Sequence, residues 1–467
     1  MKSIMLKRAI KIFVFVFAAL GLFAVSKVQA NAGELKMHTI YVGHGDCILL
    51  ESKGHYMLVD SGEASAKDTI LNYLEKHVVG DTIDYVVATH GDKDHIGSFP
   101  AIFKKYEIKN LVYSEPEKPY TNPDTGKESH FGKFVDAINE EEGLVYGNPF
   151  EGQTWTFGDA SVKVIYDGRK GTTYNESSIV TKVTCDGKSI LMTGDLPTTM
   201  EEKLMPKKYD LKADILKVGH HGAAASTSAD FLDYVKPTHA VIPNGYTEQG
   251  EYFPRDSVLQ RLALRFIKTY LATEGDIVMN IKNGVISTTH KENTKFQCIS
   301  RGQIVVIGSK FYASNTIGKK VTPKIHVYAN GELISSKHYN ISYKDATHTG
   351  IATVKVTGTK EKYVGTLSTT FSLLPRLSKI TSYSRSKNKK KIKLQWSAQN
   401  YASGYTIWYS SDKNMEKDSH KITVKGGKNN KKTLKGLKKK KKKYYVKIQA
   451  FKDGIGKGKW TTKKCIK

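Results

Sequence analysis

Apolar and polar positions alternate in two different ways along the chain. From residue 31 to about residue 300, short runs rich in β-branched residues, such as YVVATH and SILMTGD, are typical of buried strands. Between such runs, apolar residues recur at the spacing of one helical face in two segments, Ile70–Leu74 and Phe99–Phe103. Strands that alternate with helices predict an α/β fold in which the helices cover a sheet.

After about residue 300 the helical spacing disappears and strand-like alternation takes over. Segments such as KIKLQWS, GYTIWYSS and YYVKIQAF alternate β-branched or aromatic residues with polar ones, and turns rich in Gly, Asn and Ser separate them. The dipeptide Asn330-Gly331 favours a tight hairpin. The pattern predicts two small all-β modules, at 310–374 and 376–467.

The charge of the chain is divided between these two regions. Residues 31–300 contain 29 Lys and Arg against 38 Asp and Glu, whereas residues 301–467 contain 39 against 7. An acidic domain is therefore joined to a strongly basic tail, which we expect to bind an anionic polymer such as DNA or teichoic acid. The densest basic segment, Lys438–Lys443, directly precedes a predicted strand, so we expect it to form a solvated turn.

The first thirty residues have the pattern of a secretory signal peptide. Four basic residues between Lys2 and Lys11 precede an apolar run, Ile12–Val25, and Val28 and Ala30 occupy the −3 and −1 positions of a cleavage site. An uncleaved membrane anchor is the alternative, but the run is shorter than the roughly 20 residues that span a bilayer. We therefore expect a protein secreted to the extracellular space or the cell wall, with no transmembrane segment after residues 1–30 are cleaved.

Residue types that bind metals follow three of the predicted strands. The segment THGDKDHIG, Thr89–Gly97, places two imidazoles and two carboxylates within six residues directly after the strand YVVA. Two further strands end at Asp195 and at the pair His220-His221. A lone His-Asp pair would indicate only a surface loop, but three strands that end this way concentrate costly polar groups at one sheet edge. That concentration indicates a site for two divalent ions.

The motifs VDSG, THGDKDHIG, TGD and GHHG together resemble those of the metallo-β-lactamase-fold hydrolases. The segments VGHGD and NESSIV are similar to two further motifs of one branch, the soluble domain of ComEC-type competence proteins. The resemblance extends over residues 35–290, with six motifs in the same order. It implies a four-layer αββα sandwich that holds one or two divalent metal ions at one edge.

The resemblance implies metal ligands at six positions: His90, Asp92, Asp94, His95, Asp195 and His221. The first two would hold one ion, the next two and His221 would hold the second, and Asp195 would bridge both. His220 would face the substrate, although the resemblance leaves open which of the two adjacent histidines is the ligand. Asp60 would orient the metal loop from behind.

Two departures from the family pattern affect the metals. Asp92 stands where the family usually has an imidazole, and a carboxylate shifts the preference from zinc toward manganese. Asn175 and Ser178 stand where the superfamily takes its third histidine, and His130 is a possible substitute. Whether both ions bind therefore stays open.

The chemistry implied by such a site is hydrolysis, because a bound cation lowers the pKa of water toward about 7 and presents hydroxide to the substrate. Asp94, His220 and Asp46 are the candidate catalytic residues. We expect a secreted metal-dependent phosphodiesterase or nuclease, held near its substrate by the basic tail. One alternative is an esterase that acts on the phosphocholine of teichoic acids. The other is a surface binding protein with a degenerate hydrolase domain.

The two β modules also resemble known modules. The module at 310–374 is similar to a β repeat of Gram-positive surface proteins, and the module at 376–467 resembles fibronectin type III. By the second resemblance, Trp396 would be a core residue, and the strand that begins at Tyr444 would be the tyrosine-corner strand. Such modules space, anchor or bind, so we expect the tail to contact the cell-wall surface.

Overall fold

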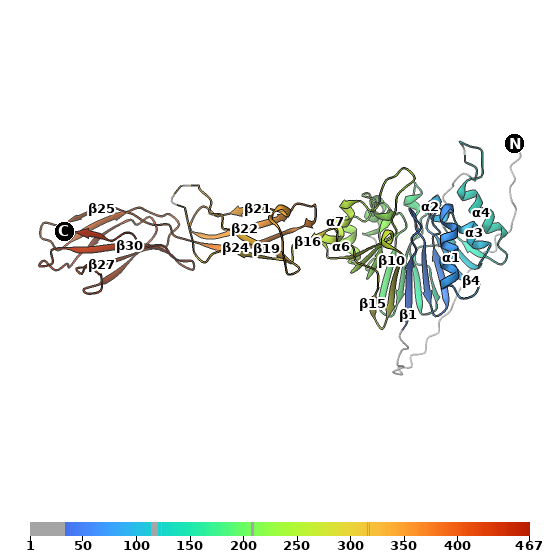
Figure 1. Ribbon diagram of the computed structural model, residues 1–467, viewed down its shortest axis with the longest axis horizontal. Coiled ribbons are helices and arrows are strands. Elements are labelled where there is room, and N and C mark those ends of the chain that lie inside the picture. Colours follow the sequence, from blue (N-terminus) through green and yellow to red (C-terminus); the bar gives the residue numbers. More distant parts are fainter. Residues whose placement is uncertain (1–32, 114–119, 123, 207–209, 315, 317) are drawn as a thin grey trace.

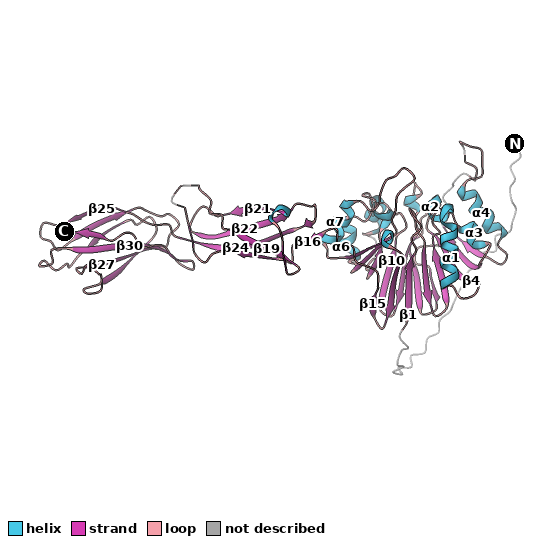
Figure 2. Ribbon diagram, viewed as in Figure 1, coloured by secondary structure: helices cyan, strands magenta, loops and turns pink. Residues whose placement is uncertain are grey.

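The described part of the chain is a mixed α/β domain followed by an all-β region (Figures 1 and 2). The predicted signal peptide, residues 1–30, lies outside the described residues. Within the described part, no helix is both long and apolar enough to cross a lipid bilayer. The computed structural model describes residues 33–113, 120–122, 124–206, 210–314, 316 and 318–467.

Two β-sheets form the centre of the first domain. In the first sheet, β3 to β6 are parallel neighbours, and β1, β2, β14 and β15 pair antiparallel. The strands of the first sheet, in spatial order, are β15 (Val285–Ser287), β14 (Ile277–Lys282), β1 (Glu34–Thr39), β2 (Ile48–Ser52), β3 (His55–Val59), β4 (Thr82–Ala88), β5 (Glu107–Tyr113) and β6 (Val145–Gly147).

The second sheet is also mixed. Strands β10 to β13 are parallel neighbours, and β7, β8 and β9 add an antiparallel half. Its strands, in spatial order, are β13 (Lys268–Leu271), β12 (His239–Ile242), β11 (Ile215–Lys217), β10 (Lys188–Met192), β9 (Val180–Cys185), β8 (Ala160–Tyr166) and β7 (Thr154–Phe157).

Alternate residues of each central strand face the opposite sheet. On β2, Ile48 and Leu50 lie in the core between the sheets, whereas Leu49 lies in the core under the helices. Because these strands are buried on both faces, they are continuous apolar runs in the sequence.

Helices cover the outer face of each sheet, which completes the expected four-layer αββα sandwich (Figures 1 and 2). The two expected helical segments, Ile70–Leu74 and Phe99–Phe103, lie in α1 and α3 and are confirmed. Helices α1 (Lys67–His77), α2 (Lys93–Ile96), α3 (Phe99–Phe103) and α4 (His130–Glu140) cover the first sheet, and α5 (Thr198–Leu204), α6 (Ala229–Val235) and α7 (Asp256–Leu264) cover the second.

The all-β region begins with a group of short sheets around a core that extends from Ile299 to Leu373. The predicted hairpin at Asn330-Gly331 is confirmed, because both residues have positive φ, 50° and 83°, as a two-residue turn of this kind requires. The strands are β16 (Gln297–Cys298), β17 (Gln303–Val306), β18 (Phe311–Tyr312), β19 (Ile325–Ala329), β20 (Glu332–Leu333), β21 (Tyr339–Lys344), β22 (Gly350–Gly358), β23 (Tyr363–Val364) and β24 (Thr366–Leu374).

The last module has its own core, in which Trp396 and Tyr405 are fully buried. The hydroxyl oxygen of Tyr444 accepts a hydrogen bond from the backbone N–H of Lys438 at 3.0 Å, and Lys438–Lys443 forms the predicted turn before β30. One sheet contains β25 (Ile380–Arg385), β26 (Ile392–Trp396) and β29 (Lys431–Leu434), and the other contains β28 (His420–Lys425), β27 (Gly404–Ser410), β30 (Tyr444–Lys452), β31 (Gly456–Lys457) and β32 (Lys464–Ile466).

Candidate metal centre

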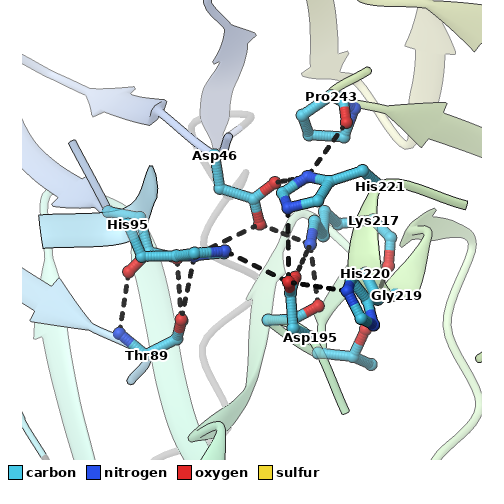
Figure 3. Close-up of polar contacts among 12 residues, drawn as sticks. Asp46, Thr89, His95, Asp195, Lys217, Gly219, His220, His221 and Pro243 are labelled. Carbon is cyan, nitrogen blue, oxygen red and sulfur yellow. Dashed lines mark hydrogen bonds and ion pairs between the residues drawn. The ribbon is translucent and has the colours of Figure 1, made fainter. Parts of the chain in front are cut away.

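The residues of the candidate site come from loops at one edge of both sheets (Figure 3). The carboxyl end of β3 is followed directly by Asp60. In the same way, His90 lies just after β4 and Asp195 just after β10. Because β3 and β4 are parallel neighbours, and β10 and β11 are too, their carboxyl ends carry loops at the same edge of each sheet. The loop between β1 and β2 adds Asp46 from the same side.

Gly45 lets that loop lie against the metal-binding loop. A Cβ atom on Gly45 would lie 2.5 Å from the carbonyl oxygen of Asp94, and the residue has a φ of +133°. The backbone N–H of Asp46 in turn donates to the carbonyl oxygen of Asp94 at 3.2 Å. Only glycine tolerates both the backbone angle and the close approach.

Four side chains converge on one small volume: Asp94, His95, Asp195 and His221, each with one ligand atom within 4.8 Å of the others. The Nε2 atoms of His95 and His221 lie 3.3 and 3.2 Å from Oδ2 of Asp195. They lie 3.7 and 3.3 Å from Oδ2 of Asp94. The Asp94 side chain is 15% exposed and the other three are 4% exposed or less, so solvent reaches the group on the side of Asp94.

A carboxylate behind each imidazole fixes the direction of its ring. Nδ1 of His95 lies 2.8 Å from Oδ2 of Asp60, and Nδ1 of His221 lies 3.1 Å from Oδ1 of Asp46. Asp60 is itself held by hydrogen bonds of 2.7 Å from the backbone N–H and the hydroxyl of Thr89. Each ring is therefore held by its Nδ1 atom and presents Nε2 to the centre of the group, as metal-binding imidazoles do.

This donor set fits a divalent cation. Nε2 of His95 and Nε2 of His221 are buried and form no hydrogen bond with any described residue. Burial opposes ionisation of Asp94, but the neighbouring imidazoles of His95 and His221 outweigh it and hold the pKa of this carboxyl well below its usual range. Two imidazole nitrogens and two carboxylate oxygens suit zinc or manganese.

Lys217, which the sequence analysis did not single out, lies directly beside this group (Figure 3). Its side chain is 1% exposed, and Nζ forms an ion pair with Asp46, lies 3.5 Å from Oδ1 of Asp195 and donates to the carbonyl oxygen of Gly194 at 2.7 Å. Burial favours the neutral amine, but Asp46 and Asp195 outweigh it and raise the pKa of Lys217. One sequence feature could have identified Lys217: it lies inside the apolar strand DILKV, where a buried charge requires a partner of opposite charge.

His90 and Asp92 form a pair beside the group of four, and the ring centres of His90 and His95 lie 4.1 Å apart. Nε2 of His90 lies 3.2 Å from Oδ2 of Asp92, and no third ligand-type side chain among the described residues joins them in a close group. Ser178 accepts a hydrogen bond on Oγ from the backbone N–H of Asp195 at 2.9 Å, so it supports the loop that carries Asp195. Asn175 begins a short 3-10 helix, Asn175–Ser177, and His130 begins α4 as an exposed residue outside the group of four.

The two adjacent histidines point to different places. His221 lies in the group of four, whereas the side chain of His220 is 29% exposed, with Nε2 3.7 Å from Oδ2 of Asp195. Both residues have left-handed backbone, with φ of 49° and 50°, a strained conformation for histidine that is common at functional sites. The ring of His220 stacks on Phe253, and His44 packs between Phe253 and His221. These residues form the rim of the site.

The rim also contains a histidine that burial keeps neutral. Burial, together with the nearby His221, lowers the pKa of His44 to about 4. Its Nε2 atom lies 3.6 Å from Oδ2 of Asp94. His44 is therefore an uncharged neighbour of the ligand group and adds no positive charge to it at neutral pH.

Three features together indicate a metallo-β-lactamase fold: the four αββα layers, the position of the group of four at one sheet edge, and its His and Asp composition. In agreement, residues 40–245 match the family model described as the metallo-beta-lactamase superfamily. This part of the chain is a metallo-β-lactamase domain, and the resemblance seen in its motifs is confirmed at that level.

Three curated relatives are similar to part of the chain. It is 30% identical to ComE operon protein 3 of Bacillus subtilis over 205 residues. The matched residues are 44% of this chain and 25% of that protein. It is 28% identical over 229 residues to Competence protein ComA of Neisseria gonorrhoeae, 48% and 29% of the two chains. It is also 28% identical over 240 residues to Recombination protein 2 of Haemophilus influenzae, 50% and 27% of the two. The chain thus spans about a quarter of the length of the curated relatives it matches.

Among solved structures, the metallo-beta-lactamase fold protein YhfI from Bacillus subtilis is similar at 12% identity. The match covers 55% of this chain and 99% of that one, with a TM-score of 0.37. The likeness of the two β modules to a surface repeat and to fibronectin type III, and the domain boundaries given above, stay predictions.

Proposed function

We propose that the protein is a metal-dependent phosphodiesterase, and more specifically a nuclease. The observation that carries the proposal is the convergence of two buried, unbonded imidazole nitrogens and two carboxylates at an edge that is open beside Asp94 and His220. A divalent cation held there supplies Lewis acidity and lowers the pKa of a bound water. Such a site suits hydrolysis at phosphorus, where negative charge accumulates on oxygen.

The side chains of the domain have distinct tasks in this proposal. Asp94 and Asp195 supply the negative charge that retains the cation, while Asp60 and Asp46 keep the two imidazoles aimed at it. His220, on the rim, can hold a proton on Nε2 toward a phosphoryl oxygen of the substrate.

A phosphodiester is favoured over a lactam for two reasons. The third histidine of the superfamily pattern is replaced by Asn175 and Ser178, and the domain is followed by a basic region that attracts phosphate-rich polymers. Two of the relatives are named for competence and for recombination, processes in which DNA is handled. These observations support DNA as the substrate.

The tail and the signal pattern complete the proposal. We infer that the protein is secreted and remains outside the cell or on its wall, because the first thirty residues have the pattern of a cleaved signal peptide. The basic β modules would hold it on an anionic polymer, either DNA or teichoic acid.

The test is an activity screen of residues 31–467 with manganese and with zinc. The substrates are single-stranded DNA, double-stranded DNA, RNA, bis-(p-nitrophenyl) phosphate and a phosphocholine ester, and the matched control is Asp195→Ala. We expect hydrolysis of the phosphodiesters, absent in the control, and at least one bound ion per chain, because Asp94, His95, Asp195 and His221 form a close ligand group. Hydrolysis of the phosphocholine ester alone would support the teichoic-acid esterase instead. Metal-free protein without activity would support the degenerate binding protein.

A further inference from the structure

The last module presents one face of its larger sheet to solvent (Figure 1). Tyr405 and Ile407 of β27 are buried in the module core, so Trp408 between Ile407 and Tyr409 points to the opposite, outer face. In the same way Val446 of β30 is in the core and Lys447 is on the outer face. The outer face thus consists of residues whose side chains lie outside the hydrophobic core.

Aromatic rings and lysines alternate on this face. Trp408 lies directly opposite Lys421 of β28 and Lys447 of β30, and the two Nζ atoms lie 4.7 and 5.6 Å from the centre of its ring. The ring of Trp460 lies 5.5 Å from that of Trp408. Two indoles and two ammonium groups therefore share one patch.

The patch continues along β30 toward β32. Nζ of Lys463 lies 5.6 Å from the centre of the Tyr445 ring, and Tyr445 pairs with Cys465 of β32. Together these residues are the aromatic–lysine face: Trp408, Lys421, Tyr445, Lys447, Trp460 and Lys463. All six are half-buried or exposed.

Acidic side chains of the described part of the chain do not neutralise the lysines of this face. Among the described residues, none forms an ion pair with Lys421, Lys447 or Lys463; the last donates to the carbonyl oxygen of Lys413. Residues 376–467 contain 29 Lys and Arg against 4 Asp and Glu, so the module offers little acidic charge to neutralise them. The face thus retains its positive charge for a ligand.

The six-lysine turn is different, although it has the higher density of charge. Lys438 and Lys441 lie 3.0 and 3.6 Å from the carboxylate of Asp418. Arg385 donates to the carbonyl oxygens of Lys441 and Lys442, which stiffens the turn. Part of its charge is therefore already paired, and within the described part of the chain no contact with an aromatic ring joins its lysines to the outer face.

We propose that the aromatic–lysine face binds single-stranded nucleic acid, with bases stacked on Trp408, Trp460 and Tyr445 and phosphates on the three lysines. This inference rests on the proposed tether function of the tail and specifies its ligand. Single strands expose base faces and phosphates together, whereas a duplex hides its base faces and a teichoic acid backbone has no aromatic ring. Basic grooves with stacking aromatics bind single strands with little sequence preference.

An alternative use of the same residues is purely structural. Lysine side chains can lay their methylene groups over aromatic rings and so cover them from water. In that case the rings serve the module's own packing, and a ligand without bases should bind as well as one with bases. The two explanations therefore differ in one measurable quantity, the dependence of affinity on the bases.

The test measures binding of residues 31–467 by fluorescence anisotropy at low salt with EDTA, so that no metal-dependent hydrolysis occurs. The probes are a labelled 20-nucleotide oligothymidine and an abasic strand of the same length. We expect wild-type protein to prefer oligothymidine, and Trp408→Ala to weaken that binding about 5- to 100-fold, the range for loss of base stacking. Binding of the abasic strand should not change.

Two further variants separate stacking from folding. Trp408→Phe keeps a flat ring and should retain most of the affinity for oligothymidine. Tyr401→Ala removes a 54% exposed aromatic residue of the same module outside the face and should have no effect. Thermal unfolding of each variant shows whether the module remains folded, and Lys421→Ser/Lys447→Ser should weaken both probes.

The outcomes that overturn the proposal are specific. Equal binding of the two probes by wild-type protein, or no effect of Trp408→Ala, would show that the rings do not bind bases. Purified teichoic acid that binds as tightly, with the same dependence on Trp408, would make a cell-wall polymer the ligand. Hydrolysis of bis-(p-nitrophenyl) phosphate by the same variants with manganese is the separate readout of the proposed activity, and Trp408→Ala should leave it unchanged. A failure there would overturn the phosphodiesterase proposal alone.

Discussion

Charged side chains are buried and paired at the edge that holds the candidate metal site, whereas on the aromatic–lysine face they are more exposed and lack acidic partners among the described residues. At the edge, Lys217 is 1% exposed and bound on three sides by Asp46, Asp195 and the carbonyl oxygen of Gly194. On the face, Lys447 is half-buried over an indole ring and has no acidic partner among the described residues. The same residue type is a fixed structural element in one region and an available binding group in the other.

The difference follows from the free energy of desolvation. A charge removed from water costs several kcal/mol unless partners replace the lost hydration, so the buried groups of the edge exist only as a connected network. A charge that remains in water costs little and gains little from a local partner. A site that positions a cation therefore consists of buried ion pairs, whereas a surface that binds a polymer consists of unpaired charges.

Removal of one carboxylate from the edge should have the largest effect on activity. Asp195→Ala or Asp94→Ala should lower kcat/KM for bis-(p-nitrophenyl) phosphate by more than about 100-fold, which is the upper range for residues that merely support metal ligands. The reason is that each change removes both an oxygen donor and the charge that retains the cation. Initial rates and metal content are the measurements, with circular dichroism as the folding control. Near wild-type activity with metal bound would contradict the assignment of that residue.

A second substitution compares the two lysines directly. Lys217→Met should lower the free energy of unfolding by about 3–5 kcal/mol, because Asp46 is then left buried without its cation. Lys447→Met, on the surface, should change it by no more than about 0.5 kcal/mol. Urea denaturation monitored by tryptophan fluorescence measures both.

The double variant Lys217→Met/Asp46→Asn checks the cause. Removal of both charges should restore part of the lost stability, because no uncompensated carboxylate remains. If Lys217→Met costs as little as Lys447→Met, the ion pair with Asp46 does not stabilise the edge.

The six-lysine turn allows a test of how much exposed charge alone contributes to polyanion binding. Replacement of Lys438–Lys443 by Ser should weaken binding to DNA and to teichoic acid alike, since only charge is removed. Two of the six lysines are paired with Asp418, so at most four contacts are lost, and the slope of log affinity against log salt on duplex DNA should become shallower by up to about 3 to 4. Titrations at several salt concentrations give the slope. Affinity that is indifferent to salt in the wild-type protein would refute the polyanion tether.

The smallest effect is expected at Asp92, which lies beside the ligand group but is not one of its four members. Asp92→His should move the ratio of manganese- to zinc-supported activity toward zinc, because nitrogen donors suit zinc and oxygen donors suit manganese. The change should be smaller than that of Asp195→Ala, because Asp92 is not one of the four side chains of the close group. An unchanged ratio would show that Asp92 does not bind the ion, and Asp92→Asn is the matched control that keeps the size of the side chain.

Much of the fold could be predicted from local sequence patterns. The apolar runs marked the central strands, the spacing within Ile70–Leu74 and Phe99–Phe103 marked two helices, and Asn330-Gly331 marked a hairpin. These features depend on neighbours a few residues apart, which is why they can be read from one chain. Helices α4, α6 and α7 were not singled out, although each buries apolar residues on one face.

The motifs also predicted which residue types gather at the edge, because the carboxyl ends of parallel strands lie together and each motif follows such a strand. Which of these side chains come into contact depends on the three-dimensional packing. The left-handed backbone at His220 and His221, together with the bond from Asp46, turns one imidazole inward and the other to the rim. Lys217 and Asp46 are 171 positions apart in the chain, so no local pattern relates them. Contacts of that range arise from the packing of the two sheets, and the packing selects the partners of a buried charge.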